Sequence, residues 1–413
     1  MRKLRIALCA LCLALLVPLL IHARRALPVD TRPLVAEKYA GWSGVLRLWI
    51  FEGWPSGTDG ISPWLNPCIA RFEKAHPGVY VQPRFVDADA IATLNDSGIL
   101  PPDMLLIPPG LLNSTKGLAA LTAPEGLRPA LAEAGASNGT TYAVPVALGG
   151  YLWAWNAALT DGVDGDWRET DAALAVPPAE PWRRWDAALL ALCAGEVAIS
   201  DGQDAPQDLD IVPDAPDLDL GLAGDAHEPT PTPAVPLPRT APRRLPAGFD
   251  WDADAWRHFV NGEAAAIPVT QREIRRLQAL AGQGKGPDWR LSPGANPFTD
   301  QLLCLAVVEN EDAGKRGLCG EFLEGLLSDE SQGALSLAGA FSVTDCPSGY
   351  APGDPLGAME AVLRDARLRV PGCFDGEWAL AAEAIVREFI ADATESPALW
   401  RRFAASLAPN PNI

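Results

Sequence analysis

Residues 44–85 read GVLRLWIFEGWPSGTDGISPWLNPCIARFEKAHPGVYVQPRF and contain a strand pattern, a helix pattern and a second strand pattern. Residues 45–51 form an apolar run that favours a strand, and the turn-forming EGWPSGTDG follows it. A helix is expected over residues 63–75 because apolar side chains recur there at helical spacing, at Leu65, Cys68, Ile69 and Phe72. HPG ends that helix, and residues 79–85 predict the next strand.

The same alternation continues along the chain. Short buried strands are expected at residues 104–107 and 142–146, and helices at residues 185–193, 319–326 and 378–407. Strands that alternate with helices indicate a mainly parallel sheet covered on both faces. The sequence therefore predicts the α/β class.

Length and charge limit the possible functions. The 413 residues allow two or three domains, and the 48% of hydrophobic residues can fill their cores. With 33 Lys and Arg against 52 Asp and Glu, the formal net charge is −19. This balance argues against a nucleic-acid partner, because phosphate binding needs a basic surface.

Residues 1–30 have the pattern of an export signal. Arg2, Lys3 and Arg5 precede an uncharged apolar run at residues 6–21, so the protein is expected outside the cytoplasm. No A-x-A-like cleavage site follows the run, which favours an uncleaved membrane anchor over a cleaved signal peptide. Both interpretations stay open, since 16 residues fall short of the roughly 20 that span a bilayer.

Six cysteines lie beyond the signal. An even number outside the cytoplasm permits disulfides, and Cys346 and Cys373, which lie in loops rich in Pro and Gly, are the candidate pair. Three others lie on apolar helical faces and are expected to be ordinary buried thiols: Cys68, Cys193 and Cys319.

Residues 201–246 form an acidic, proline-rich insertion that is expected to be disordered. Nine acidic and no basic residues occur at positions 201–228, and ten prolines at positions 206–246. The text DLDIVPDAPDLDL lacks the glycine and the twelfth-position Glu of a calcium loop. No metal site and no cofactor are predicted.

Catalytic signatures are lacking. Only four histidines are present, and the sequence has no G-x-S-x-G, H-E-x-x-H, Walker or G-x-G-x-x-G motif. The chain is therefore expected not to be an enzyme, although a glycosidase with a carboxylate pair stays open because acids are plentiful. The 14 Trp against 5 Tyr favour carbohydrate recognition, since indole faces stack on sugars. Trp54 follows a strand, where open α/β sheets bind ligands.

The sequence outside the export signal and the acidic insertion resembles family 1 extracellular solute-binding proteins, the maltose-binding-like group. The resemblance is carried by residues 44–83 and by four later segments: GILPPDMLLIPPGLL, TYAVPVALGGYLWAWNAAL, WRHFVNGEAAAIPVTQREI and FLEGLLSDESQGALSLAGAFSVT. It implies a two-lobed periplasmic-binding-protein-like fold of type II, in which each lobe is a mainly parallel sheet flanked by helices and hinge crossings join the lobes.

By this resemblance the first lobe comprises residues 44–147 and 297–345. The second comprises residues 148–200, 247–296 and 346–408. Gly149 and Gly150 would form the hinge at the first crossing, where backbone angles must change, unless the pair is an ordinary turn.

The resemblance also implies ligand-binding residues, carried over from matching positions: Glu52, Trp54, Asp103, Tyr151, Trp153, Gln271 and Arg272. Thr299 and Asp300 are weaker candidates. Asp103 has the alternative of a local cap or turn bond. Arg272 stands where the family commonly has tryptophan. It either forms a surface ion pair or indicates an acidic sugar or another anion as ligand, since guanidinium binds carboxylate bidentately.

The expected function is an extracytoplasmic receptor that binds a small polar solute, most simply a sugar or sugar acid, by hinge closure. Its partners would be that solute and the permease subunits of an ABC-type importer in the membrane. The alternatives are an extracytoplasmic carbohydrate-active hydrolase and a membrane-anchored sensor with a binding-protein fold.

Overall fold

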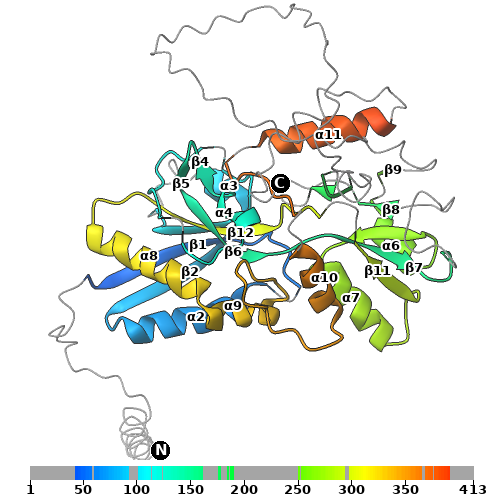
Figure 1. The fold of residues 1–413 in the computed structure, drawn as a ribbon, viewed down its shortest axis with the longest axis horizontal. Coiled ribbons are helices and arrows are strands. Elements are labelled where there is room, and N and C mark those ends of the chain that lie inside the picture. Colours follow the sequence, from blue (N-terminus) through cyan, green and yellow to red (C-terminus); the bar gives the residue numbers. More distant parts are fainter. Residues whose placement is uncertain are drawn as a thin grey trace, which may run out of the picture.

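The computed structural model describes residues 42–57, 60–92, 101–112, 114–122, 124–160, 175–177, 184–185, 187–189, 250–251, 253–293, 297–364, 368–374 and 376–390. The predicted export signal, the acidic insertion, Cys193 and the tail beyond Ile390 lie outside the described residues. Figure 1 shows the described elements in two groups, joined by chain that runs on from strand β6 to strand β7.

The first lobe is built on a five-stranded mixed sheet with the order β2-β1-β3-β12-β6. Its strands are β1 (Gly44–Phe51), β2 (Val79–Val86), β3 (Met104–Ile107), β6 (Ala143–Leu148) and β12 (Leu302–Val307). β1 pairs in parallel with β2 and β3, whereas β12 pairs antiparallel with β3 and β6. The chain thus returns from a distant part of the sequence to complete the sheet.

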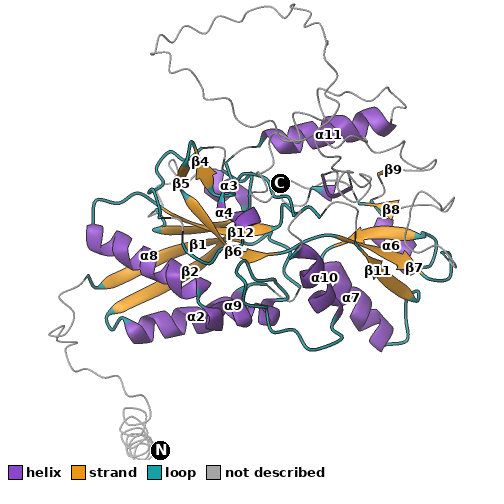
Figure 2. Ribbon diagram, in the orientation of Figure 1, coloured by secondary structure: helices purple, strands orange, loops and turns teal. Residues whose placement is uncertain are grey.

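The helices of the first lobe bury the apolar faces that their periodicity predicts. Helices α2 (Ser62–Ala75), α8 (Ala313–Leu327) and α9 (Asp329–Gly333) lie together along one side of the sheet (Figure 2). Helix α2 buries the predicted stripe, and the ring of Phe72 meets Phe322 of α8 edge-on at 5.2 Å. The indole of Trp64 donates to the carbonyl of Ser331 over 2.7 Å. The remaining short elements are α3 (Ala88–Ala92), α4 (Pro129–Ala132), β4 (Ala136–Ser137), β5 (Thr140–Thr141) and η2 (Leu335–Ala338).

The second lobe contains a three-stranded sheet with the order β10-β7-β11. Its elements are β7 (Leu152–Asn156), β10 (Ala266–Val269), β11 (Trp289–Ser292), α6 (Ala255–Val260) and α7 (Gln271–Gly282). Both outer strands pair antiparallel with β7, so the expectation of a mainly parallel sheet is wrong for this three-stranded sheet. The chain forms β10, α7 and β11 in succession, and β7 from the first crossing lies between the two strands and pairs antiparallel with both. Strands β8 (Ala175–Val176) and β9 (Asp250–Trp251) are two residues long and pair in parallel.

Strand β7 separates two apolar cores. Leu152 and Ala154 face the core that α6 and α7 cover, while Trp153 and Trp155 face a second core. Helix α11 (Glu377–Ile390) covers this second core with Trp378, which lies 6.2 Å from Phe298 between ring centres. The predicted tail helix is therefore confirmed over its described part.

Helix α10 (Pro355–Leu363) lies between the two groups of elements, beside α7 (Figure 1). Asp354 caps its first turn and forms an ion pair with Arg275 of α7 at 2.9 Å. At its other end Glu360 is buried and bonded to Ser348. Tyr350, beside Arg275, donates to the carbonyl of Ala340, and burial raises the pKa of its hydroxyl well above the usual range.

The described cysteines are free thiols, so the expected bridge between Cys346 and Cys373 is not present. The sulfur of Cys346 contacts the carbonyl of Asp329 at 3.5 Å, whereas that of Cys373 lies against Cys304. Loop composition could indicate exposure but not the neighbour of each sulfur. Cys68 and Cys319 are buried as expected, and burial followed by the charge of Asp103 raises the pKa of Cys319 to about 12.

Within the ranges given above, no helix has both the length and the hydropathy that a bilayer crossing requires.

Candidate functional site

Two chain crossings are bonded to each other between the lobes. The amide of Gly149 donates to the carbonyl of Gln301 over 2.7 Å, and the hydroxyl of Thr299 donates to the carbonyl of Gly149 over 2.8 Å. A third segment joins them, since the amide of Thr299 donates to the carbonyl of Arg369 over 3.0 Å. These bonds hold the three segments together between the lobes.

Gly149 and Gly150 are glycines because their surroundings leave no room for a side chain. A Cβ atom on Gly149 would lie 2.7 Å from the side-chain oxygen of Gln301 and closer still to the amide nitrogen of Gln271. A Cβ atom on Gly150 would lie 2.5 Å from Leu363. Neither glycine has a positive φ. The expected hinge pair thus lies at the crossing. Glycine is required there because neighbouring side chains occupy the Cβ positions.

Replacing Gly149 with alanine is expected to lower the free energy of unfolding by about 1–3 kcal/mol, because the new methyl group displaces two buried amides. Urea denaturation measures this change. Gly282→Ala is the matched control, because Gly282 ends helix α7 with open space around its Cβ position. Equal stability of the two variants would contradict the packing explanation.

Gln271 joins the second lobe to the loop after β1. It is the first residue of α7, which begins with a capping box between Thr270 and Glu273. The cap fixes the first turn, so the side chain of Gln271 extends from the helix start toward the first lobe. Its amide donates to the carbonyl of Pro55, and its oxygen accepts the amide of Gly150 over 3.2 Å.

Unsatisfied polar groups lie beside this junction. Trp54 precedes Pro55, and its buried indole N–H has no hydrogen-bond partner within the described residues. Both side-chain amide atoms of Gln301 are likewise buried and unpaired. Buried polar groups are nearly always bonded, so the unpaired atoms at the junction of the two lobes are candidates for bonding a polar molecule. The indole N–H groups of Trp153, Trp155 and Trp378 in the second core are unpaired in the same way, so it is the position between the lobes that indicates a site. Gln301 was not expected from sequence, although it directly follows the weaker candidates Thr299 and Asp300.

Tyr151 and Asp300 form part of the crossing itself. The hydroxyl of Tyr151 donates to Asp300 over 2.6 Å, and the amide of Arg184 donates to the other oxygen of that carboxylate over 3.1 Å. The ring of Tyr151 meets Trp185 edge-on at 5.3 Å. Both polar groups are therefore used within the protein, where they hold the second crossing to the start of the second lobe.

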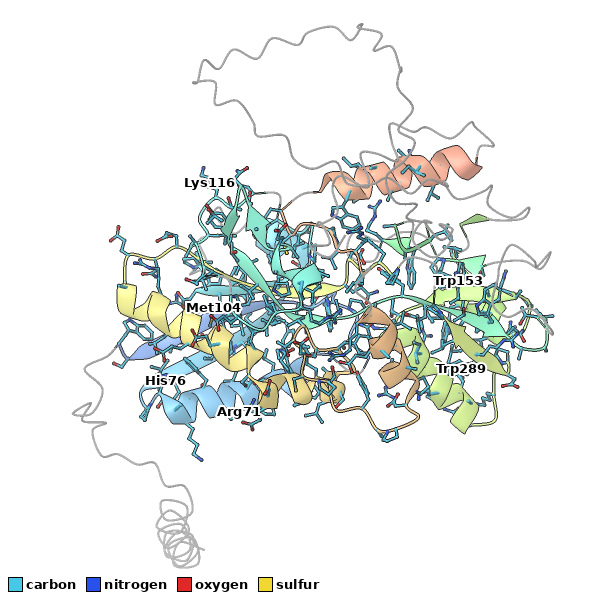
Figure 3. The ribbon with its side chains drawn as sticks, viewed as in Figure 1. Arg71, His76, Met104, Lys116, Trp153 and Trp289 are labelled. Carbon is cyan, nitrogen blue, oxygen red and sulfur yellow. The ribbon has the colours of Figure 1, made fainter. Side chains whose placement is uncertain are left out.

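Trp153 lies in the second core of the second lobe. It is 1% exposed and packs against Trp155 with 5.8 Å between ring centres. Figure 3 shows Trp153 and Trp289 within the second lobe, and Met104 in the first. This burial makes Trp153 part of the lobe's packing in the conformation described.

Asp103 does not join this group. It precedes β3, whereas Trp54 follows β1, and because the two strands are parallel the residues lie at opposite ends of the sheet. Its carboxylate pairs with Lys315 at 2.5 Å and accepts the amide of Arg47 over 2.7 Å. Both partners lie far from Asp103 in the chain, so these bonds are not the local cap or turn bond of the alternative, and they hold the carboxylate within the first lobe in the conformation described.

Glu52 and Arg272 flank the junction from opposite lobes. Glu52 follows β1 with an exposed side chain, and its amide donates to the carbonyl of Val86 over 3.0 Å. Arg272 is half-buried in the first turn of α7, where its amide donates to the hydroxyl of Thr270. The structure thus brings together Trp54, Gln271 and the glycine pair, with Glu52 and Arg272 next to them in the chain.

Comparison with known proteins identifies the architecture. No protein-family model matches the chain, and no curated protein matches it in sequence. Among solved structures, a maltodextrin-binding protein from L. casei BL23, without ligand, superposes with a TM-score of 0.57 at 12% identity, covering 88% of this chain and 97% of that chain.

Two further structures are similar. The GacH receptor of Streptomyces glaucescens, solved unliganded and with acarbose, has a TM-score of 0.53 at 14% identity, covering 88% of this chain and 97% of its own. An ABC substrate-binding protein from Listeria monocytogenes in complex with cycloalternan has a TM-score of 0.50 at 12% identity, covering 88% and 98%. The fold expected from the sequence is therefore confirmed: the chain has the two-lobed α/β fold of the periplasmic binding proteins.

Proposed function

We propose that this protein is an extracytoplasmic receptor that binds a sugar or sugar acid between its lobes and delivers it to an ABC-type importer. The observation that carries the proposal is the junction of Gln271 with Pro55, beside the unpaired polar groups of Trp54 and Gln301. The three structural neighbours are sugar-binding proteins by their descriptions, which supports the same ligand class.

The chemistry of the junction suits a polyhydroxylated solute. The indole N–H of Trp54 is a donor, and the side-chain amide of Gln301 offers both a donor and an acceptor to hydroxyl groups. Both side chains are buried. A sugar can bond both at once while its C–H faces lie against aromatic carbon. A carboxylate on the sugar could in addition approach Arg272, whose guanidinium favours paired oxygens.

Binding and closure are coupled in this proposal. Gln271 and Arg272 belong to the second lobe, while Glu52 and Trp54 belong to the first. A ligand that contacts both sets binds the closed arrangement better than the open one, and it shifts the population by that difference. The crossings at Gly149 and Gln301 are the segments that would absorb the rotation.

A thermal-shift screen with maltodextrins, other neutral oligosaccharides and sugar acids would test the proposal, followed by calorimetric titration of the best ligand. Trp54→Phe is expected to weaken binding about tenfold, because it removes one ligand hydrogen bond while keeping most of the packing. Trp289→Phe, on the half-buried strand β11, is the matched control and should bind as the unmodified protein does. Equal affinities of both variants would remove Trp54 from the site.

The hydrolase alternative predicts turnover, which the receptor does not. Incubation with oligosaccharides that raise the melting temperature should release no reducing ends. Product formation that is lost on replacing a single carboxylate would favour the enzyme.

Export is part of the proposal and has a separate test. Fusion of residues 1–41 to a reporter that is active only outside the cytoplasm should give activity. The cell fraction that holds the full chain would distinguish a cleaved signal from a membrane anchor. A cytoplasmic location would contradict the receptor role.

A further inference from the structure

Two cysteines far apart in sequence meet inside the first lobe. Cys304 lies on β12, the return strand inside the five-stranded sheet, and Cys373 lies ten residues after the end of α10. Their sulfur atoms are 3.1 Å apart, and the residues are 0% and 2% exposed. A disulfide bond requires about 2.05 Å, so a shift of about 1 Å would bring the sulfurs to bonding distance.

We propose that Cys304 and Cys373 form a disulfide bond in the exported protein. Two thiols would exchange with the disulfide of a thiol oxidant, either a protein disulfide or oxidised glutathione. One S–S bond forms in this chain and one breaks in the oxidant, whose two sulfurs become thiols and take up the two hydrogens. The proposal rests on the extracytoplasmic location in the proposed function, because cytosolic thiols are kept reduced.

The surroundings hold Cys373 in place from both sides. Its amide donates to the carbonyl of Ala134 over 2.7 Å, and its carbonyl accepts the amide of Gly110 over 3.0 Å. These bonds fix its backbone against the first lobe, so the sulfur does not rely on a mobile loop for its position. The other described cysteines have different neighbours, as Cys68 donates to the carbonyl of Trp64 and Cys346 to that of Asp329.

The bond would lie in the first lobe, a few residues from the point where the chain passes between the lobes. Four residues before Cys373, Arg369 bonds to both Pro297 and Thr299 at the crossing. Five residues after it, Trp378 enters the second core under α11. A covalent link at Cys373 would therefore fix this third connecting segment to the first-lobe sheet, while α11 stays with the second lobe.

Burial determines when the bond can form. Desolvation, followed by the neighbouring thiol, raises the pKa of Cys304 well above its usual value, and both cysteines are buried away from an oxidant in the folded protein. The disulfide is therefore expected to form during folding and then to resist reductants until the chain unfolds.

The test is peptide mapping of the full chain after unfolding and refolding with reduced and oxidised glutathione. Free thiols are blocked in denaturant, and the protein is digested without reductant. The expected product is one cross-linked peptide pair containing Cys304 and Cys373. Recovery of both cysteines as blocked single peptides, or cross-linked to other cysteines, would overturn the proposal.

Matched variants and a stability measurement complete the test. Cys319→Ala removes a buried thiol outside the pair and should leave the cross-link intact, whereas Cys373→Ala should leave Cys304 open to blocking in denaturant. The refolded protein should melt about 10 °C higher when oxidised than when reduced, because the link closes a loop of 69 residues. An unchanged melting temperature would overturn the stabilising role. Ligand titration of the same samples tests the proposed function separately. The cross-link is expected to form without ligand, so a sample that binds no sugar can still contain it.

Discussion

Replacing Glu360 with alanine is expected to lower the free energy of unfolding by about 3–5 kcal/mol, the largest loss that we expect from removing one side chain. Glu360 is 5% exposed. Its carboxylate accepts the amide and hydroxyl of Ser348, at 3.1 Å and 2.6 Å, and pairs with Arg364 at 3.1 Å. Without it, the amide and hydroxyl of Ser348 lose this acceptor, and Arg364 loses this carboxylate partner while its guanidinium still donates to backbone carbonyls.

The network around Glu360 connects α10 to the first lobe. Arg128 lies nearby and donates to the carbonyls of Ser342 and Leu363, and burial, followed by the charge of Arg364, lowers its pKa to about 10. The carboxylate of Glu360 offsets this positive charge. Removing the Glu360 carboxylate therefore leaves the guanidinium groups of Arg128 and Arg364 near each other with one negative charge fewer to balance them.

Urea denaturation of Glu360→Ala and of Glu330→Ala would check this prediction. Glu330 also pairs with an arginine, Arg71 at 3.2 Å, but its side chain is 73% exposed, so its loss should cost less than about 1 kcal/mol. Glu360→Gln keeps the shape and one acceptor oxygen, and it should lie between the two. A Glu360→Ala variant as stable as Glu330→Ala would refute the role of the buried network.

Replacing Gly135 with alanine should also cost about 3 kcal/mol or more. A Cβ atom there would lie 2.5 Å from the carbonyl carbon of Ala143 and closer still to its oxygen. The obstacle is backbone at the start of β6, so no side-chain rotation relieves it. In addition, the carbonyl of Gly135 accepts the amides of Tyr142 and Ala143, which ties the two segments together.

Gly320→Ala is the opposite case and provides the control. Gly320 lies inside helix α8 with open space at its Cβ position, so alanine should raise stability by about 0.5–1 kcal/mol. Denaturant midpoints of the two variants should therefore shift in opposite directions. A Gly135→Ala midpoint at or above that of the unmodified protein would show that the backbone of β6 moves without cost.

Local pattern alone predicted much of the first lobe. The expected strands at residues 45–51, 79–85 and 104–107 correspond to β1, β2 and β3, and the expected helix at residues 63–75 corresponds to α2. These elements have a buried face, and burial imposes a repeat of two or 3.6 residues that is visible in the sequence. The parallel order of β1, β2 and β3 then follows from the alternation of strands and helices.

The candidate site was predicted in part. Trp54 and Gln271 were named as separate loop residues, and the structure brings their segments together through the carbonyl of Pro55. Gln301 was missed because its local sequence does not show that its side-chain amide is buried without a hydrogen-bond partner among the described residues. Asp103 was expected to bind ligand, but Lys315, more than 200 residues later, pairs with it.

The sequence by itself determined the strands β1, β2 and β3, the helix α2 and the α/β class, because the buried faces of these elements repeat every few residues. The position of the glycine pair at a crossing came from the family resemblance. Only the tertiary structure decided that β12 returns between β3 and β6, that β7 runs antiparallel between β10 and β11, and that Cys304 meets Cys373. Such contacts join residues far apart in the chain. Their geometry is set by the packing of whole elements, which leaves no periodic trace in the local sequence.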